Sequence, residues 1–131
     1  MKRRTLLHLH GETFARRYQV ASQAITAAAG GEEVYVVFWF DALRRLALGG
    51  FDDPEAGEDR KVHERHAALG LPPPSEMLAE ARLLGARFVA CETAVLLAGL
   101  TPADLGERVD EILGLQQIQA LARAAQVVPY V

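Results

Sequence analysis

The sequence predicts an α/β domain of three layers, in which helices cover both faces of a mainly parallel sheet of about five strands. Short apolar runs alternate with segments of helical periodicity along all 131 residues. The run from Val34 to Phe40 is continuously apolar, as is typical of parallel strands that are buried on both faces. Helical segments lie between successive apolar runs, and parallel strands need crossovers of this kind.

The first half of the chain is expected to contain two strand–helix units. A strand over residues 5–9 ends at Gly11, and Thr13 is the expected N-cap of the following helix. Apolar side chains at three- and four-residue spacing give this helix one buried face, formed by Phe14, Tyr18, Ala21, Ile25 and Ala28. The helix ends at Gly30 and Gly31. After the second strand, over residues 34–40, Asp41 is expected to cap a helix that ends at Gly49.

Residues 51–74 interrupt this rhythm. Their first part is acidic and rich in turn formers, residues 61–69 suit a short polar helix, and three prolines at 72–74 form a rigid, extended link. We interpret the segment as a surface excursion and a candidate lid, within a single domain that spans residues 1–131. His63 and His66 have a spacing that could hold a metal on a helix, but no third ligand is recognisable. A solvated polar helix is favoured, and no metal site is expected.

The second half continues the alternation. Ser75 is expected to cap a helix that leads to a third strand over residues 88–90, and Cys91 stands at the end of that strand. A helix over residues 92–98 should end at Gly99. Thr101 and Pro102 are typical of a helix start, and residues 109–113 are a weak strand candidate. An amphipathic helix over residues 115–125 and a last strand over residues 127–131 complete the expected fold.

Composition excludes several classes of protein. The net charge of −3 gives no electrostatic reason to expect nucleic acid as a partner. The basic start resembles the lead of a signal peptide, but His8 and His10 break the apolar run behind it, and no stretch approaches the roughly 20 apolar residues of a membrane span. A cytoplasmic protein without a membrane partner is therefore expected. The single cysteine excludes an internal disulfide. No phosphate-binding glycine motif is present, so no cofactor is expected, although flavin or mononucleotide binding without a motif stays open.

Cys91 is the candidate for covalent chemistry because it stands where a strand leads directly into a helix. The first N–H groups and the dipole of a helix favour the thiolate form of such a cysteine. The competing interpretation is an inert, buried residue, as most free cysteines are. Ligands of open parallel sheets bind beyond the carboxyl ends of the strands, and His10, Asp41 and Cys91 would share that rim.

Other residues near the expected rim have either a site role or a structural one. His10 could orient or protonate the thiolate, and Thr93 could supply a hydroxyl or an N–H group. The ligand-binding candidates are Gly11, Glu12, Trp39, Phe40, Asp41 and Glu92. Asp41 is equally well explained as an N-cap, Trp39 and Phe40 as core, and Glu12 as a charge in the first turn of its helix. Glu92 would oppose formation of a thiolate if its carboxylate lay near the sulfur.

Several short motifs occur in a familiar order along nearly the whole chain. They are Val37-Phe38-Trp39-Phe40-Asp41-Ala42-Leu43, Pro74-Ser75-Glu76-Met77, Leu84-Gly85-Ala86-Arg87-Phe88-Val89-Ala90-Cys91 and Leu96-Leu97-Ala98-Gly99-Leu100. With these motifs the chain resembles the DsrE/DsrF-like family, small flavodoxin-like α/β domains of sulfur-relay systems, and most of all its DsrE-like, peroxiredoxin-like branch. The family often has a serine three residues after the cysteine, where this chain has Ala94.

The resemblance implies a persulfide on Cys91 and a homotrimer or homohexamer with that cysteine near a subunit boundary. The leading hypothesis is therefore a sulfur carrier or sulfurtransferase that works with unidentified donor and acceptor proteins. The alternative is a non-catalytic oligomeric module, for ligand binding or scaffolding, with a buried structural Cys91. A thiol-dependent peroxidase is a third and weaker possibility.

Overall fold

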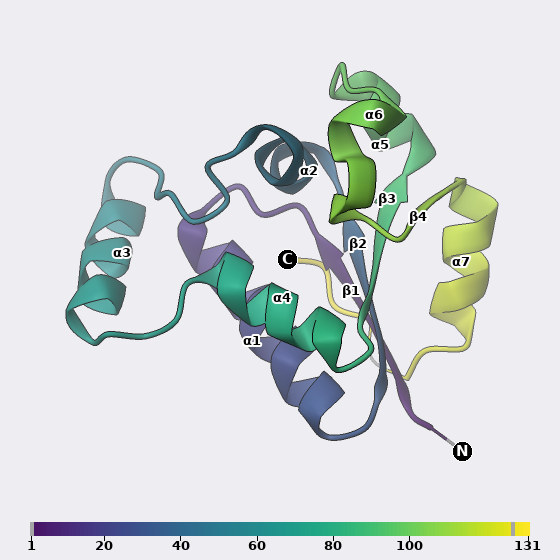
Figure 1. The fold of residues 1–131 in the computed structure, drawn as a ribbon, viewed down its shortest axis with the longest axis horizontal. Coiled ribbons are helices and arrows are strands. Elements are labelled where there is room, and N and C mark those ends of the chain that lie inside the picture. Colours follow the sequence, from purple (N-terminus) through teal and green to yellow (C-terminus); the bar gives the residue numbers. More distant parts are fainter. Residues whose placement is uncertain (1, 127) are drawn as a thin grey trace.

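The computed structural model describes residues 2–126 and 128–131 (Figure 1). Strands and helices alternate as the periodicity predicts. In chain order the elements are β1 (Arg4–Leu9), α1 (Phe14–Ala29), β2 (Glu33–Phe38), α2 (Phe40–Leu48), α3 (Glu58–Ala68), α4 (Pro74–Leu83), β3 (Arg87–Cys91), α5 (Glu92–Leu97), α6 (Pro102–Leu105), the 3-10 helix η1 (Gly106–Arg108), β4 (Glu111–Leu113) and α7 (Leu115–Arg123).

The described residues form a parallel sheet in which the strands are ordered β1-β2-β3-β4. Helices α1 and α4 pack side by side on one face of the sheet, and α7 lies on the other (Figure 1). Helices α2, α5 and α6 lie at the end of the sheet where the strands finish. The predicted three-layer α/β/α class is therefore confirmed, and the candidate rim lies at the end occupied by these three short helices.

The predicted number of about five strands is wrong, because the residues that the structure describes form a sheet of four strands. The segment expected as a last strand runs beside β1, where Pro129 accepts a hydrogen bond from the His8 N–H at 3.0 Å and Val131 donates one to the His8 carbonyl at 2.8 Å. It makes an isolated parallel bridge, between His8 and Tyr130, rather than a continuous ladder. Pro129 has no N–H to donate, which limits pairing here. Val127, which begins the predicted strand, lies outside the described residues.

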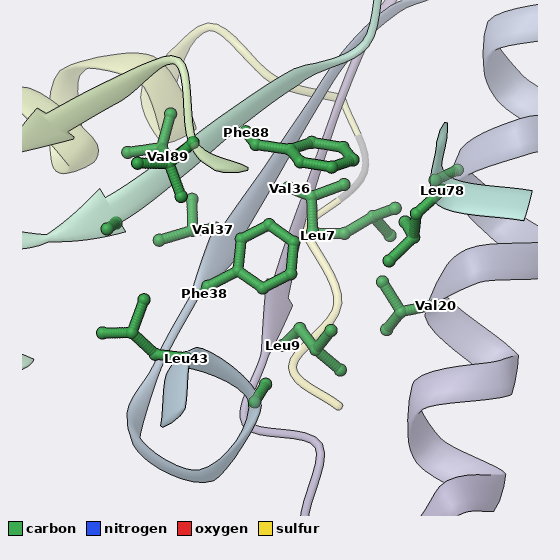
Figure 2. Packing of buried hydrophobic residues seen from close by; sticks show 14 of the residues in the cluster. Leu7, Leu9, Val20, Val36, Val37, Phe38, Leu43, Leu78, Phe88 and Val89 are labelled. Atoms are coloured by element: carbon green, nitrogen blue, oxygen red, sulfur yellow. The ribbon is translucent and has the colours of Figure 1, made fainter. Parts of the chain in front are cut away.

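The core lies mainly between the sheet and the pair α1 and α4. Phe38 and Phe88 project from neighbouring strands toward Val20 and Leu78 of these helices, and the two ring centroids are 5.2 Å apart (Figure 2). Side chains alternate along each strand, so the intervening positions face the α7 layer. Along each strand, one set of alternate residues therefore faces α1 and α4, and the other set faces α7. Only side chains of the same set can come together at the site.

Two predicted helix caps are wrong. Trp39, rather than Asp41, is the N-cap of α2, and Asp41 lies in its first turn. Pro73, rather than Ser75, is the N-cap of α4, because Pro74 suits the first helical position. Two other caps are confirmed: the Thr13 side chain accepts a hydrogen bond from the N–H of Arg16, and the Thr101 side chain forms a capping box with Asp104.

Two buried charged side chains, Asp59 and Arg17, form hydrogen bonds between residues 51–74 and the start of α1. The Asp59 carboxylate, only 8% exposed, accepts hydrogen bonds from the N–H groups of Phe14, Ala15 and Glu55 at 2.8, 3.0 and 2.8 Å. Arg17, fully buried, donates hydrogen bonds to the carbonyls of Phe51, Gly11 and Asp53. The excursion is thus tied down by polar contacts that span 34 to 45 residues of sequence.

Helix α3 lies against α1 through aromatic contacts. The rings of His63 and His66 approach Phe14 edge-on, with centroids 4.8 and 5.0 Å away, and His66 also lies edge-on to Tyr18. The two histidines therefore serve as packing groups for this helix.

Candidate functional site

The register of the sheet places three of the predicted site residues in one row. Leu9 pairs with Phe38, and Phe38 pairs with Ala90, so that the next residues along the strands are His10, Trp39 and Cys91. The Trp39 N–H bonds to the Leu9 carbonyl at 3.0 Å, which continues the parallel pattern by one residue. Alternation puts all three side chains on the α7 face. His10 and Cys91 are then separated by two strand spacings, roughly 10 Å, with Trp39 between them.

Cys91 is fully buried, with 0% of its surface exposed. It is the last residue of β3 and the N-cap of α5, and its side chain makes no capping hydrogen bond there. The next two residues, Glu92 and Thr93, are exposed in the first turn of α5. The strand–helix junction predicted from the sequence is present. The Cys91 side chain, however, is buried in the folded chain rather than exposed at the carboxyl edge of the sheet.

Aromatic rings surround the histidine end of this row. The Trp39 Nε1–H donates a hydrogen bond to Nδ1 of His8 at 3.0 Å, and the ring of Tyr130 stacks on His8 with centroids 4.4 Å apart. His10 lies edge-on to Trp39 and to Phe40, at 5.8 and 6.2 Å between centroids. We refer to His8, His10, Trp39, Phe40 and Tyr130 as the aromatic cluster. It belongs to the same face and the same end of the sheet as Cys91.

The backbone of Phe40 is strained. Its φ of +27° lies in the left-handed region, which bulky side chains rarely adopt, and its ring is 44% exposed. Such strain costs about 1–3 kcal/mol and persists where the surroundings enforce it, often at functional sites. The turn from β2 into α2 therefore presents an aromatic ring to solvent at the carboxyl edge of the sheet.

His8 is held in its neutral form. Burial, and then the charge of nearby His10, lower the pKa of His8 to about 4. The hydrogen bond from Trp39 requires an unprotonated Nδ1, so the proton of the neutral ring is on Nε2. A cavity of about 130 Å³ opens beside this ring, lined by His8, Trp39, Leu115, Ile118, Gln119, Ala122 and Tyr130. The site thus offers a small, mainly apolar space next to a neutral imidazole.

The His8 pKa predicts a loss of stability in mild acid. The ring titrates near pH 6.5 when the chain is unfolded and near 4 when it is folded, so the unfolded state binds more protons between these values. Acidification from pH 6.5 to 4 should therefore lower the free energy of unfolding by up to about 3 kcal/mol through this residue. Urea unfolding at several pH values measures the loss, and His8→Phe should flatten the curve in this window. An equally steep curve for the variant would show that other groups cause the loss.

The remaining predicted ligand-binding residues have structural contacts. Gly11 has a φ of +65°, and an added Cβ would lie 2.9 Å from both the Ala42 Cβ and the Arg17 Cγ, so only glycine fits. Asp41 accepts a hydrogen bond from Arg45 at 2.9 Å and lies 3.7 Å from Arg17. Glu12 is exposed and pairs with Arg16 at 3.5 Å. The structure brings His10, Trp39 and Phe40 together, and it places Gly11, Glu12 and Asp41 in supporting roles.

The sequence assigns neither His8 nor Tyr130 to the site. Two histidines at alternate strand positions were a sufficient signal for a shared face, but the tyrosine meets them only because the C-terminal segment runs beside β1. Within residues 2–126 and 128–131, no group of three histidine, cysteine or acidic side chains could hold a metal ion. In the same part of the chain, no helix has the length and apolar character needed to cross a membrane.

Comparisons with known proteins support the fold. No family model matches the chain, and no curated protein matches it. A solved structure titled "Structure of Protein of Unknown Function MTH1491 from Methanobacterium thermoautotrophicum" is similar, with a TM-score of 0.67 and 18% sequence identity over 99% of this chain and 100% of that one. At this identity the likeness establishes a shared architecture over the full length of both chains.

Proposed function

We propose that this protein is a sulfur carrier or sulfurtransferase that holds sulfane sulfur as a persulfide on Cys91 and passes it to a thiol of a partner protein. The observation that carries the proposal is the row of His10, Trp39 and Cys91 at the carboxyl edge of the sheet. Ligands of open parallel sheets bind at this edge. The single cysteine of the chain supplies the nucleophile, and His10, two strand spacings away along the same row, would act on a docked partner group rather than on the sulfur directly.

The transfer needs no external oxidant. The Cys91 thiolate attacks the outer sulfur of a donor persulfide, the sulfur–sulfur bond of the donor breaks, and the donor leaves as a thiolate. The acceptor thiolate then attacks the outer sulfur on Cys91, which restores the Cys91 thiolate. Each step exchanges one sulfur–sulfur bond for another. Because the chain has no second cysteine to resolve the persulfide internally, this intermolecular relay suits its composition.

Burial sets a condition on this chemistry. With Cys91 0% exposed, the donor and the acceptor reach the sulfur only if the elements around it move when a partner docks. Helix α5, which begins directly after Cys91, spans only six residues and carries two leucines that are each 71% exposed. A short helix with exposed apolar side chains has few contacts to lose, and in this proposal α5 is the part that moves. When closed, the site would protect a persulfide from small thiols, because thiol exchange depends on access.

Exposed apolar side chains support the proposed homotrimer or homohexamer. They belong to elements at the same end of the sheet as the site, and they are Phe40, Leu48, Leu96, Leu97, Leu115 and Tyr130. Exposed apolar side chains mark interaction surfaces where they form a contiguous patch. A subunit boundary there would lie close to Cys91.

The persulfide is tested by mass. Incubation with a persulfide donor should add the mass of one sulfur atom to the intact wild-type protein and nothing to Cys91→Ala, the matched control. A reductant that removes persulfide sulfur should reverse the gain. If the wild type gains no mass while a known carrier does so under the same conditions, the proposal fails.

The burial of Cys91 also favours a second candidate function, in which the cysteine has no chemical role. In a non-catalytic oligomeric module for ligand binding or scaffolding, Cys91 would be a core residue and would never be uncovered. A bulky thiol reagent distinguishes the two. A carrier should react within the lifetime of the native protein and faster in the presence of a donor, whereas the scaffold should react only after denaturation in urea.

A further inference from the structure

A wide cavity lies on the opposite face of the sheet from Cys91, between α2 and α4. It has a volume of about 730 Å³, which is within the usual range of small-molecule sites. Its floor includes Phe51, Leu78 and Phe88, which are between 2% and 7% exposed. The floor is thus made of core side chains, of which only a small part of each faces the groove. We call this feature the α2–α4 groove.

Three arginines border this apolar floor, and they differ in how many of their N–H donors already form hydrogen bonds. Arg45 is fully engaged, because it donates hydrogen bonds to Asp41, to Glu55 and to the Gly50 carbonyl. Its role is to hold the wall of the groove together. It therefore has little capacity left for a ligand.

The other two arginines retain donors. Arg82 bonds to Asp110 through one nitrogen at 2.8 Å, and its guanidinium carbon lies 5.2 Å from the centre of the Phe88 ring. Arg108 makes one long hydrogen bond, at 3.5 Å, to the Asp104 carbonyl, and within the described residues it has no ion-pair partner. A guanidinium has five N–H donors, so most of those on these two side chains are available. The groove combines an apolar floor with N–H donors of Arg82, which is paired with Asp110, and with the charge of Arg108, for which no ion pair is found among the described residues.

We propose that the α2–α4 groove binds an amphipathic organic anion, a compound with one carboxylate or sulfonate head and an aromatic or aliphatic body. The body would cover Phe51, Leu78 and Phe88, and the head would pair with Arg108 and Arg82. A purely apolar compound would leave the arginine donors unused, and an inorganic anion would leave the floor uncovered. This site is independent of the persulfide chemistry, because it lies on the other face of the sheet.

A matched pair of fluorescent probes tests the contribution of the anionic head and that of the apolar body to binding. 8-Anilinonaphthalene-1-sulfonate is an amphipathic anion, and N-phenyl-1-naphthylamine has the same ring system without the sulfonate. The wild type should bind the sulfonate with one saturable site and the amine more weakly. Arg108→Gln should weaken the sulfonate about fivefold and leave the amine unchanged, because only the sulfonate forms a charge-assisted hydrogen bond. Arg123→Gln, an exposed arginine of α7, is the charge-matched control and should change neither affinity.

A second variant fills the groove. Ala79 is an exposed residue of α4 that lines it, so Ala79→Phe should be tolerated by the fold and should weaken both probes by about tenfold or more. The thermal midpoint of each variant confirms folding. The proposal is overturned if Ala79→Phe binds the sulfonate as the wild type does, or if Arg108→Gln weakens both probes equally. It is also overturned if sedimentation shows that Ala79→Phe dissociates an oligomer, because the groove would then be a subunit interface.

Discussion

Arg17→Met is expected to destabilise the protein by about 4 kcal/mol, because the buried carbonyls of Gly11 and Phe51 and the partly buried carbonyl of Asp53 would lose their donors. That loss is comparable with the whole stability of many small domains. Asp41 would also lose the charge that lies 3.7 Å from its carboxylate. Urea unfolding followed by circular dichroism measures the change, and a variant that does not fold at all would agree with it.

The neighbouring residue provides the control for this prediction. Arg16 is exposed and pairs only with Glu12, so Arg16→Met should change the free energy of unfolding by less than about 0.5 kcal/mol. Equal effects of the two substitutions would show that the buried guanidinium does not hold residues 51–53 in place. Arg17→Lys should recover only part of the stability, because one ammonium cannot reach all three carbonyls.

Asp59→Ala is the second substitution with a large expected effect. It removes the acceptor of three backbone N–H groups and leaves the buried N–H of Phe14 without a partner, at a cost of about 3 kcal/mol. The excursion should also become sensitive to proteases, since the contact of Asp59 with the first turn of α1 would be gone. Limited proteolysis and urea unfolding measure the two effects. Glu58→Ala, at an exposed position with one exposed partner, should have neither.

The contribution of Asp59 depends on pH. Burial alone would raise the pKa of Asp59, but hydrogen bonds from the backbone of Glu55, Ala15 and Phe14, together with the charge of Arg17, hold it below its ordinary value. The folded state therefore binds this proton less readily than the unfolded state. The stabilisation is complete above about pH 4 and is lost as the pH falls through the lowered pKa. Acid-induced loss of stability should be smaller in Asp59→Ala than in the wild type.

Local sequence patterns were sufficient to predict the class of fold. Strands and helices follow from apolar runs and from three- and four-residue spacing, which act within a few residues. Arg17 was missed because its partners are supplied by residues 51 and 53, and no local pattern connects them. Asp59 was missed for the same reason, since the helix that it caps lies 45 residues away. The C-terminal strand was predicted from its apolar residues, but Pro129 supplies no donor for a continuous ladder.

The candidate site was predictable only in part. The sequence identified Cys91 and His10 as strand-end residues, and their common row depends on the strand order β1-β2-β3, which the sequence does not specify. The burial of Cys91 depends on how neighbouring elements, such as α5 against β3, pack in the folded chain. The pairing of His8 with Tyr130 depends on the return of the chain to β1. Each of these features is set by tertiary arrangement rather than by residue spacing.

The position of Trp39 gives the molecule a built-in optical reporter. It is the only tryptophan of the chain, its indole donates to His8, and it occupies the row position between His10 and Cys91. Protonated imidazole quenches indole emission, so steady-state fluorescence should follow the charge of His8 without any label. The same signal would register any rearrangement around Trp39, in real time and on unmodified protein.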